Sequence, residues 1–400
     1  ARRLFRTLFL VGRFDPGASE WTRLGRQDIN STRHQQVSYE AALQGLVLLK
    51  NDGALPLAAG RHIAVLGPQA VARAGLLSDY AGDQICYQGS DHCIETVAEA
   101  IGAANVGGST VVQQGVEVNS NATAGEQPAL DAAAAADVVV LVLGIDKPIE
   151  HEGIDRADTA LPGRQEAFAL RVLALGRPTV LVLTNGGALA IDALVNRSGP
   201  APYAIVEAFN PATSGARALA ASLFGRENRW GKLPMTMYPH SFVSEKAMAD
   251  YDMSSGVGRT YRYYTGAPLF PFGWGLSLTT FSMSCAQVAR TTTQRYECTV
   301  QNVGAVDGDE VVLVYHVAAD IGPVDHPVPR RSLIDFARLS CRAGAEATVG
   351  FDVEMEQLRL VDAAGRRKLY PGTHKLVFSR GHGDEESFDV AVAPPATIFA

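Results

Sequence analysis

The sequence predicts an α/β protein in which a mostly parallel α/β sandwich is followed by an all-β sandwich. Two observations lead to this prediction. From about residue 91, continuously apolar Val/Ile/Leu segments alternate with helix-like segments, as in a parallel sheet covered on both faces. After "FPFGWGLSLTTF" at 270–281, short alternating segments follow one another with turn signals and no helix-like segment between them, which is typical of a β-sandwich.

The elements of the first part follow in a regular order. Residues 37–50 have the apolar spacing of a helix that runs into a short apolar segment, and "HIAVLGP" then indicates a buried strand ending in a Gly-Pro loop. The helix-like segments after it are "CIETVAEAIGAA", "QPALDAAAAA", "GRQEAFALRVLAL" and "SGARALAASLFG". The strands expected between them are "STVVQQGV", "DVVVLVLGI", "PTVLVLTNGG" and "YAIVEAF". Ligands of such sheets bind at the carboxyl ends of the strands.

The second part is expected to be a sandwich of about a hundred residues. Its strands are expected within "CAQVARTTTQRYECTVQNVG", "DEVVLVYHV", "EATVGFDV" and "HKLVFSR". We therefore divide the chain into an entry segment at 1–36, an α/β domain at 37–275 and a β-domain at 276–400. The first residues, "ARRLFRTLFLVGRFDPG", contain no obvious signal peptide because arginines interrupt the apolar positions. They suggest the middle of a longer polypeptide or a processed product.

Composition excludes several classes of partner. A net charge of -7 and a pI near 5.8 give no basic surface for nucleic acid or an anionic membrane. The most apolar stretch, "AAAAADVVVLVLGI", contains Asp137 and is too short to span a bilayer, so no membrane span is expected. No grouping of Cys, His and Asp has the spacing of a metal site, and no phosphate-binding or dinucleotide motif is complete, so no cofactor is expected.

Cysteines and glycosylation sequons bear on the compartment. Cys86 and Cys93 are seven residues apart in a turn-rich segment and are a candidate disulfide, and five cysteines leave at least one thiol free or paired with another chain. Asn30, Asn121 and Asn196 each begin an Asn-X-Ser/Thr sequon. Together these features predict a protein of the secretory pathway, either secreted or delivered to a vacuole or lysosome.

An acidic loop follows the most apolar strand. The loop, "PIEHEGIDRADTALPG" at 148–163, holds Glu150, Glu152, Asp155 and Asp158 at the carboxyl end of "DVVVLVLGI". Taken alone, such a loop is more often a solvated turn than a catalytic device.

Five ordered motifs give the loop a context. They are "LQGLVLLKNDGALPL", "IAVLGPQA", "EGIDRADTALPGRQ", "WGKLPMTMYP" and "GRTYRYYTGAPLFPFGWGLSLTTF". In this order they resemble glycoside hydrolase family 3, and its β-xylosidase/α-arabinofuranosidase branch more than its β-glucosidases. The resemblance implies a TIM-like barrel, an α/β sandwich and a fibronectin type III-like domain. This chain is similar to the second and third, so that residues 1–36 would be the linker from a barrel that the chain lacks.

The resemblance also implies roles for the loop. Retaining glycosidases use two carboxyl groups about 5–5.5 Å apart, and in this family the nucleophile Asp lies on the barrel while the acid/base Glu precedes an Asp-Arg pair. The matching residue in "EGIDR" is Glu152, with Glu150 as the runner-up that would contact sugar hydroxyls or be solvated. We expect Asp155 and Arg156 to brace the loop by an ion pair.

Two further segments, at Tyr80 and at 208–215, bear on the sugar site that the resemblance implies. Tyr80 in "DYAG" either lines the sugar site or packs in the interior. Members of the xylosidase branch usually carry a glycine-rich turn at "AFNPATSG", 208–215, where this chain has Ala208, Ala212 and Thr213 in place of Gly, Gly and Gln. Glycine permits backbone conformations that alanine resists, so this loop is expected to be reshaped, which leaves open the exact substrate and, to a lesser extent, activity itself.

Two functions remain open on this basis. The first is the C-terminal portion of an exo-acting retaining β-glycosidase, most consistent with a β-xylosidase that removes terminal xylosyl or arabinosyl residues from an oligosaccharide. Its partner would be a barrel domain or chain, and the chain alone would be inactive. The alternative is a non-catalytic structural or carbohydrate-associated component of an extracellular assembly that retains the hydrolase fold.

Overall fold

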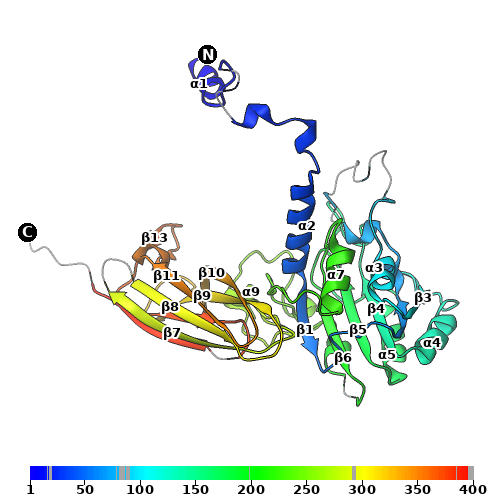
Figure 1. Ribbon diagram of the computed structural model, residues 1–400. Helices are drawn as coiled ribbons and strands as arrows, with labels where there is room; N and C mark the ends of the chain where they lie inside the picture. Colours follow the sequence, from blue (N-terminus) through cyan, green and yellow to red (C-terminus); the bar gives the residue numbers. More distant parts are fainter. Residues whose placement is uncertain are drawn as a thin grey trace, which may run out of the picture.

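The computed structural model of the chain describes residues 1–400 apart from positions 16, 18–19, 78, 81–85, 87–90, 198, 291–293, 384 and 395–400. It consists of an α/β domain, a β-domain and an N-terminal arm (Figure 1). The α/β domain contains a six-stranded sheet in the order β1-β6-β5-β4-β2-β3. All neighbouring strands are parallel except β1 and β6. The predicted fold class is therefore confirmed.

The bounds of these strands agree closely with the apolar segments of the sequence. They are β1 (Val47–Asn51), β2 (His62–Leu66), β3 (Ser109–Gln113), β4 (Val138–Gly144), β5 (Thr179–Thr184) and β6 (Tyr203–Glu207). Every residue of β4, β5 and β6 is buried. These strands read as continuous apolar runs because helices cover both faces of the sheet.

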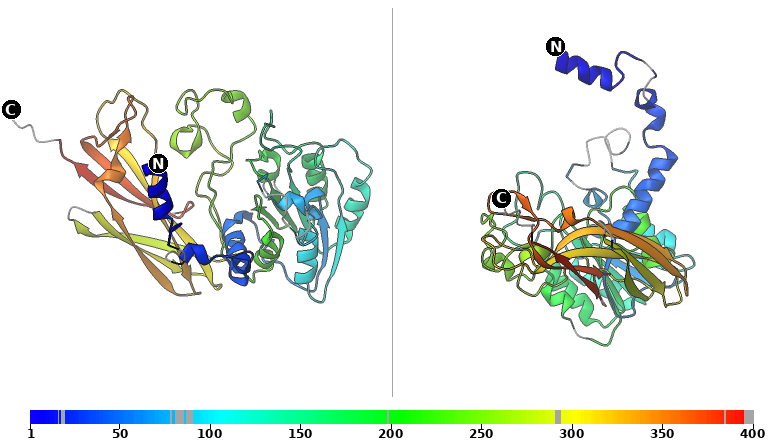
Figure 2. Two further views of the ribbon diagram at one scale, coloured as in Figure 1. Left: turned by 90° about the horizontal axis from the view of Figure 1, so that it is seen from above. Right: turned by 90° about the vertical axis from the view of Figure 1, so that its left-hand side faces the viewer.

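Two groups of helices cover the two faces (Figure 2, left). One face packs on α2 (Thr32–Gly45), α3 (Val97–Ala104) and α7 (Gly215–Leu223). The other packs on α4 (Glu126–Ala135), α5 (Gln165–Ala174) and α6 (Asp192–Val195). Side chains that alternate along each strand enter one core or the other, so the sheet is the middle layer of three.

Helix α2 begins five residues earlier than the apolar pattern indicates. Ser31 caps it, since its side chain accepts a hydrogen bond from the main-chain nitrogen of His34 at 3.3 Å. The first turns of α2 are polar and contact no core, which is why hydrophobic periodicity did not reveal them. Only Ala42 and Leu43, near its end, are buried.

The N-terminal arm precedes α2 and stands away from both domains (Figure 1; Figure 2, right). It contains α1 (Arg2–Leu10) and two short 3-10 turns, and no residue of α1 is buried. The exposed apolar side chains of the arm include Leu4, Phe5, Phe9 and Leu10. An apolar helix face of this kind is incompletely buried in the chain as it stands.

The β-domain is a sandwich of two antiparallel sheets. The four-stranded sheet contains β10 (Ser332–Cys341), β9 (Gly308–Asp320), β14 (Gly372–Ser379) and β15 (Glu385–Val392). The three-stranded sheet contains β11 (Glu346–Val353), β8 (Gln294–Asn302) and β7 (Phe281–Arg290). Short strands β12 (Leu360–Val361) and β13 (Arg367–Lys368) form a separate pair. Tyr296, Phe351 and Phe378 pack between the sheets.

The segment between the domains contains the short helices α8 (Phe242–Glu245) and α9 (Thr260–Tyr263). A buried ionic cluster joins the domains: Nζ of Lys232 lies 2.7 Å from Glu310, which also accepts a hydrogen bond from Arg380 at 3.2 Å. Burial lowers the pKa of Lys232, and the nearby Glu310 partly opposes this. Through Lys232 and Glu310, the cluster joins the loop after α7 to the beginning of β9.

Candidate active site

The acidic loop begins at the carboxyl end of β4. The main-chain oxygen of Asp146 accepts hydrogen bonds from the nitrogens of Ile149 (3.0 Å) and Glu150 (3.2 Å), which turns the chain back over the sheet. A tight hairpin follows, in which His151 and Ile154 exchange main-chain hydrogen bonds of 3.3 and 2.9 Å. Glu152 therefore lies at the tip of the hairpin, where its side chain is exposed.

The Glu150 carboxylate is held by Arg156. Nε of Arg156 pairs with Oε2 of Glu150, and Nη2 of Arg156 donates to the main-chain oxygen of Ala188 at 2.9 Å. The side chain of Glu150 is 31% exposed, and that of Arg156 is 12% exposed. The brace expected of Asp155 and Arg156 thus forms between Arg156 and Glu150, whereas Asp155 is exposed and lines the hollow described below.

Glu152 contacts a segment that lies far away in the sequence. Its main-chain nitrogen donates to Oδ2 of Asp79 at 3.1 Å. A hydrogen bond from Tyr80 to the Glu152 carboxylate raises the pKa of Tyr80, with smaller contributions from burial and from Asp79. Tyr80 is 76% exposed, so it is not the interior packing residue that we held as one alternative. Asp79 and Tyr80 orient the tip of the hairpin.

Asp79 and Tyr80 border an open hollow of about 380 Å³. Asp79, Tyr80, Asp146, Glu150, His151 and Asn210 are among the side chains that line it. Burial raises the pKa of Asp146, whose Oδ1 atom has no hydrogen-bond partner among the described residues. The volume falls within the range of small-molecule sites, about 300–1,000 Å³. The hollow therefore has the size and the hydrogen-bonding groups to hold a polar ligand. Glu150 lines it directly, whereas Glu152 adjoins it through its hydrogen bond with Tyr80.

A buried carboxyl group, that of Glu207, lies at the same edge of the sheet as the acidic loop. Glu207, at the end of β6, is fully buried and accepts a hydrogen bond from the main-chain nitrogen of Phe209 at 3.0 Å. Burial raises its pKa to about 8, against hydrogen bonds from Phe209 and Asn185 that lower it. Asn185 in turn donates to the main-chain oxygen of Gly187 at 2.9 Å. Gly187 lies directly against the Glu150–Arg156 pair.

The loop at 208–215 also borders the hollow, through Asn210. Phe209 and Ala212 have φ angles of 52° and 62°, in the left-handed region that favours glycine. The nitrogen of Ala212 donates to the main-chain oxygen of Leu76 at 2.9 Å, which ties the loop to the segment before Asp79. Ala212 therefore adopts the conformation for which glycine was expected, and Ala208 does not.

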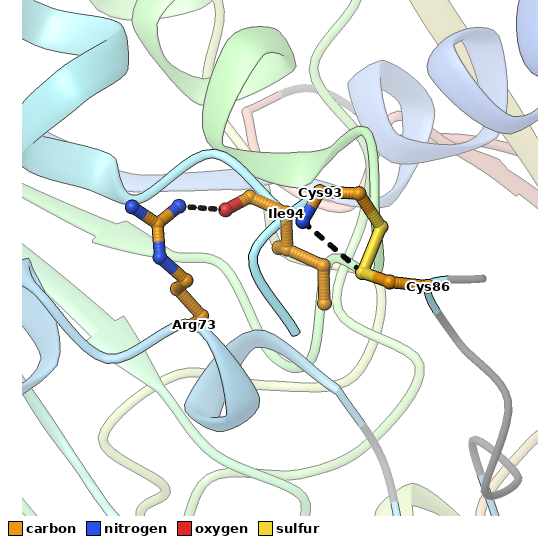
Figure 3. Close-up of a disulfide and its surroundings, with 4 residues drawn as sticks. All are labelled: Arg73, Cys86, Cys93 and Ile94. Carbon is orange, nitrogen blue, oxygen red and sulfur yellow. Dashed lines mark hydrogen bonds between the residues drawn. A yellow bond between two sulfur atoms is a disulfide. The ribbon is translucent and has the colours of Figure 1, made fainter. Parts of the chain in front are cut away.

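Cys86 and Cys93 form a disulfide, with an S–S distance of 2.01 Å (Figure 3). The main-chain nitrogen of Cys93 also donates to Sγ of Cys86 at 3.1 Å. Close by, the Arg73 guanidinium donates to the main-chain oxygen of Ile94 (Figure 3). A second disulfide joins Cys285 to Cys298, and Cys341 is a buried free thiol.

The remaining predicted sites are accessible. Asn30, Asn121 and Asn196 are all exposed. Outside the undescribed positions, the chain has no cluster of three His, Cys, Asp or Glu side chains suited to a metal ion. Within the same residues, no helix combines the length and the apolar character needed to cross a bilayer.

Comparison with protein families decides the assignment. Residues 46–278 match the Glycosyl hydrolase family 3 C-terminal domain, and residues 310–380 match a Fibronectin type III-like domain. The chain belongs to glycoside hydrolase family 3. The predicted resemblance is thereby confirmed, and the α/β domain that carries Glu152 is the family's C-terminal domain.

Curated relatives match more than nine-tenths of the chain. It is 35% identical over 397 residues to the exo-1,4-beta-xylosidase bxlB of Emericella nidulans, with 94% of this chain and 50% of that protein covered. It is 34% identical over 407 residues to Beta-D-xylosidase 1 of Arabidopsis thaliana, with 92% of this chain and 51% of that protein covered. The chain thus spans about half the length of these family 3 relatives.

Solved structures support the same fold. A GH3 exo-beta-xylosidase (XlnD) in complex with a xylobiose aziridine activity-based probe superimposes with a TM-score of 0.84 at 28% identity, covering 99% of this chain and 54% of that one. The beta-glucosidase from Listeria innocua in complex with isofagomine gives a TM-score of 0.80 at 25% identity, covering 98% and 55%. The arrangement of the two domains is therefore shared within the family.

Sequence reasoning did not single out Asp146, Asn185 or Glu207. Each lies at or directly after the carboxyl end of a strand, namely β4, β5 and β6. The rule that places ligands at this edge would have drawn attention to them. Glu207 also stood out as the one acidic residue within the apolar segment "YAIVEAF".

Proposed function

We propose that this chain is the C-terminal portion of an exo-acting retaining β-glycosidase, in which Glu152 is the general acid/base. The observation that carries the proposal is the different use of the two glutamates. Glu150 lines the hollow but is engaged by Arg156, whereas Glu152 is exposed and is held against two lining residues, Asp79 and Tyr80, by hydrogen bonds. An acid/base needs a carboxyl group that can reach the leaving-group oxygen and exchange its proton.

The reaction needs a second carboxylate, which the proposal assigns to an Asp on a barrel domain or chain. The exposed hairpin and the arm support this partner. Helix α2 runs into β1, whose first residue pairs with Glu207 at the carboxyl edge of the sheet. The arm therefore leaves the α/β domain at the same edge of the sheet as the acidic loop that follows β4 (Figure 1). A barrel that covers the apolar side chains of the arm would lie over Glu152. Glu152 would protonate the departing oxygen and then deprotonate the attacking water.

The relatives favour xylose as the sugar, because the curated members with 34–35% identity are named as xylosidases. We propose β-xylosidase activity of the assembled protein, on terminal xylosyl or arabinosyl residues of an oligosaccharide. The sequons and disulfides agree with a secreted or vacuolar glycoprotein. Detection of N-linked glycans at Asn30, Asn121 or Asn196 by mass spectrometry of the native protein would test this location.

The decisive experiment compares the pure 400-residue chain with the same chain combined with a barrel domain. We expect the chain alone to leave an aryl β-xyloside intact, since the nucleophile is missing, and the combination to hydrolyse it. Turnover by the chain alone would overturn the division of labour. Native material without a barrel polypeptide would favour the second function, a non-catalytic carbohydrate-associated component, for which the altered loop at 208–215 is the structural argument.

A further inference from the structure

A second hollow lies on the β-domain, where the linker between the domains meets the sandwich. It has a volume of about 350 Å³. Residues from three places line it. They are Arg262 of α9, His316 and Leu333 of strands β9 and β10, and Arg359 and Arg367 in the segment 355–368 that ends with β13. It shares no residue with the hollow beside Glu152.

The rim of this hollow is positively charged. Its described lining includes three arginines and no carboxylate. Arg359 and Arg367 share one acidic neighbour, Glu356, at 2.7 and 3.7 Å. Arg262 donates to the Ser332 hydroxyl at 3.3 Å and has no ion-pair partner in the described part of the chain. The rim therefore carries positive charge that the protein itself does not neutralise, and guanidinium groups bind carboxylates in a bidentate manner.

The floor of the hollow contains a buried imidazole. His316 is 3% exposed, and its Nε2 atom lies 2.7 Å from Nδ1 of His374, whose Nε2 atom lies 2.8 Å from the main-chain oxygen of Tyr370. A carbonyl only accepts, so His374 carries its proton on Nε2 and receives a hydrogen bond from Nε2–H of His316. Nδ1 of His316 is then left with a free lone pair.

Burial favours the neutral form of the His316 ring. Burial, with a smaller effect of the adjacent His374, lowers the pKa of His316 to about 4. A neutral imidazole with a bare Nδ1 atom is an acceptor, and it is matched by a hydroxyl donor rather than by an anion. The site therefore asks for two different groups on one ligand, a carboxylate at the rim and a hydroxyl at the floor.

We propose that this hollow binds a sugar acid, with the rim arginines holding its carboxylate and Nδ1 of His316 accepting a hydrogen bond from one of its hydroxyl groups. The volume suits a ligand of this size, and the apolar wall formed by Leu333 and Leu360 would contact a ring face. The site would hold an acidic saccharide without cleaving it. The proposal is independent of the function proposed for Glu152.

The test is calorimetric titration of the 400-residue chain with methyl β-D-glucuronide and with methyl β-D-glucoside. These two probes differ only in a carboxylate against a hydroxymethyl group. We expect the glucuronide to bind at least about tenfold more tightly, as for one good charged contact, and less tightly as salt is raised. Equal binding of both probes, or no binding of either, would overturn the proposal.

Variants distinguish this site from other basic surfaces. Arg262→Gln and Arg367→Gln should each weaken glucuronide binding by about fivefold or more. Arg366→Gln is the matched control, since the side chain of Arg366 is 78% exposed, pairs with Asp362 and does not line the hollow. It should leave binding unchanged, and equal losses in all three variants would contradict the assignment. Acetate that competes as well as the glucuronide would contradict the role of His316.

Because the arginine variants change exposed side chains, they should fold normally. Unchanged melting temperatures would verify this. His316→Phe is a second arm: it removes the acceptor and should abolish the preference for glucuronide over acetate while the arginine contacts remain. A His316→Phe chain that melts like the parent and keeps that preference would also refute the hydroxyl contact. None of these measurements depends on catalysis.

Discussion

The side-chain nitrogen of Asn185 donates a hydrogen bond of 2.9 Å to the main-chain oxygen of Gly187. This bond holds the turn at Gly187, which packs against the Glu150–Arg156 pair. Asn185 directly follows β5, and its neighbour Glu207 ends β6, so two sheet strands support the acidic loop. This contact connects a fully buried carboxyl group to the loop that carries Glu152.

The two glutamates of the loop should respond differently to substitution in the assembled enzyme. Glu152→Gln should reduce hydrolysis of a xylo-oligosaccharide by about 10²–10⁴-fold, since it removes the proton donor. The same variant should act more normally on aryl xylosides with good leaving groups, which need little protonation. Glu150→Gln should lose less and should not discriminate between the two substrates. Steady-state kinetics on both substrates checks this, and equal losses in both variants would rule against Glu152.

A methyl group at Gly187 should loosen the loop. A Cβ atom there would lie 2.6 Å from Oε1 of Glu150 and 2.7 Å from Nη2 of Arg156, so the ion pair would have to move. We expect Gly187→Ala to speed tryptic cleavage after Arg156. Gly186→Ala is the control, because its nearest neighbour, Oδ1 of Asn210, would be 3.3 Å away. Similar cleavage rates in both variants would show that the turn does not hold the pair.

The free energy of unfolding should decrease as the pH rises, because of Glu207. Its pKa is raised to about 8 in the folded state, against about 4.3 in an unfolded chain. Between these values the folded state holds one more proton, so the stability that Glu207 contributes falls by about 1.4 kcal/mol per pH unit and is constant above pH 8. Glu207→Gln removes this decline. The melting temperature of the variant relative to the parent should rise from pH 5 to pH 8, and a constant difference would show that Glu207 is already ionised.

Two alanines of the 208–215 loop form a matched pair. Ala212, at φ 62°, should gain from substitution by glycine, because a non-glycine residue in this region costs about 1–2 kcal/mol and glycine's added chain entropy returns about 0.5–1. We expect Ala212→Gly to stabilise the chain by about 0.5–1 kcal/mol. Ala208 is buried outside that region, so Ala208→Gly should destabilise by about 1 kcal/mol. Thermal melting of both variants measures the contrast, and effects of the same sign would contradict it.

The interdomain cluster should be far more sensitive than a surface pair. Glu310→Gln leaves Lys232 and Arg380 without their shared, buried carboxylate, and we expect a loss of about 3–5 kcal/mol. Glu385→Gln breaks an exposed pair with Arg331, 3.0 Å long, and should cost less than about 1 kcal/mol. Unfolding in urea provides the comparison, and losses of equal size would show that burial does not govern this cluster.

The sequence predicted the layers of the fold better than the contacts of the site. Continuous apolar runs identified β4, β5 and β6, because strands covered on both faces leave no polar alternation. The pairing of Arg156 with Glu150 depends on the hairpin at Glu152, whose shape no periodicity encodes. The approach of Tyr80 to Glu152 is a tertiary contact between distant segments, so spacing along the chain gave no sign of it.

The position of β1 has a consequence for synthesis. β1 precedes the other strands of the α/β domain along the chain, yet among the described residues its sheet neighbour is β6, the last of these strands to be made. Its other side is closed later still, when the nitrogen of Leu276 donates to the oxygen of Leu48 at 2.8 Å. The apolar strand β1 therefore stays unpaired during synthesis until the last part of the α/β domain has been made. We expect chains released before Leu276 to aggregate rather than to persist as partly folded domains.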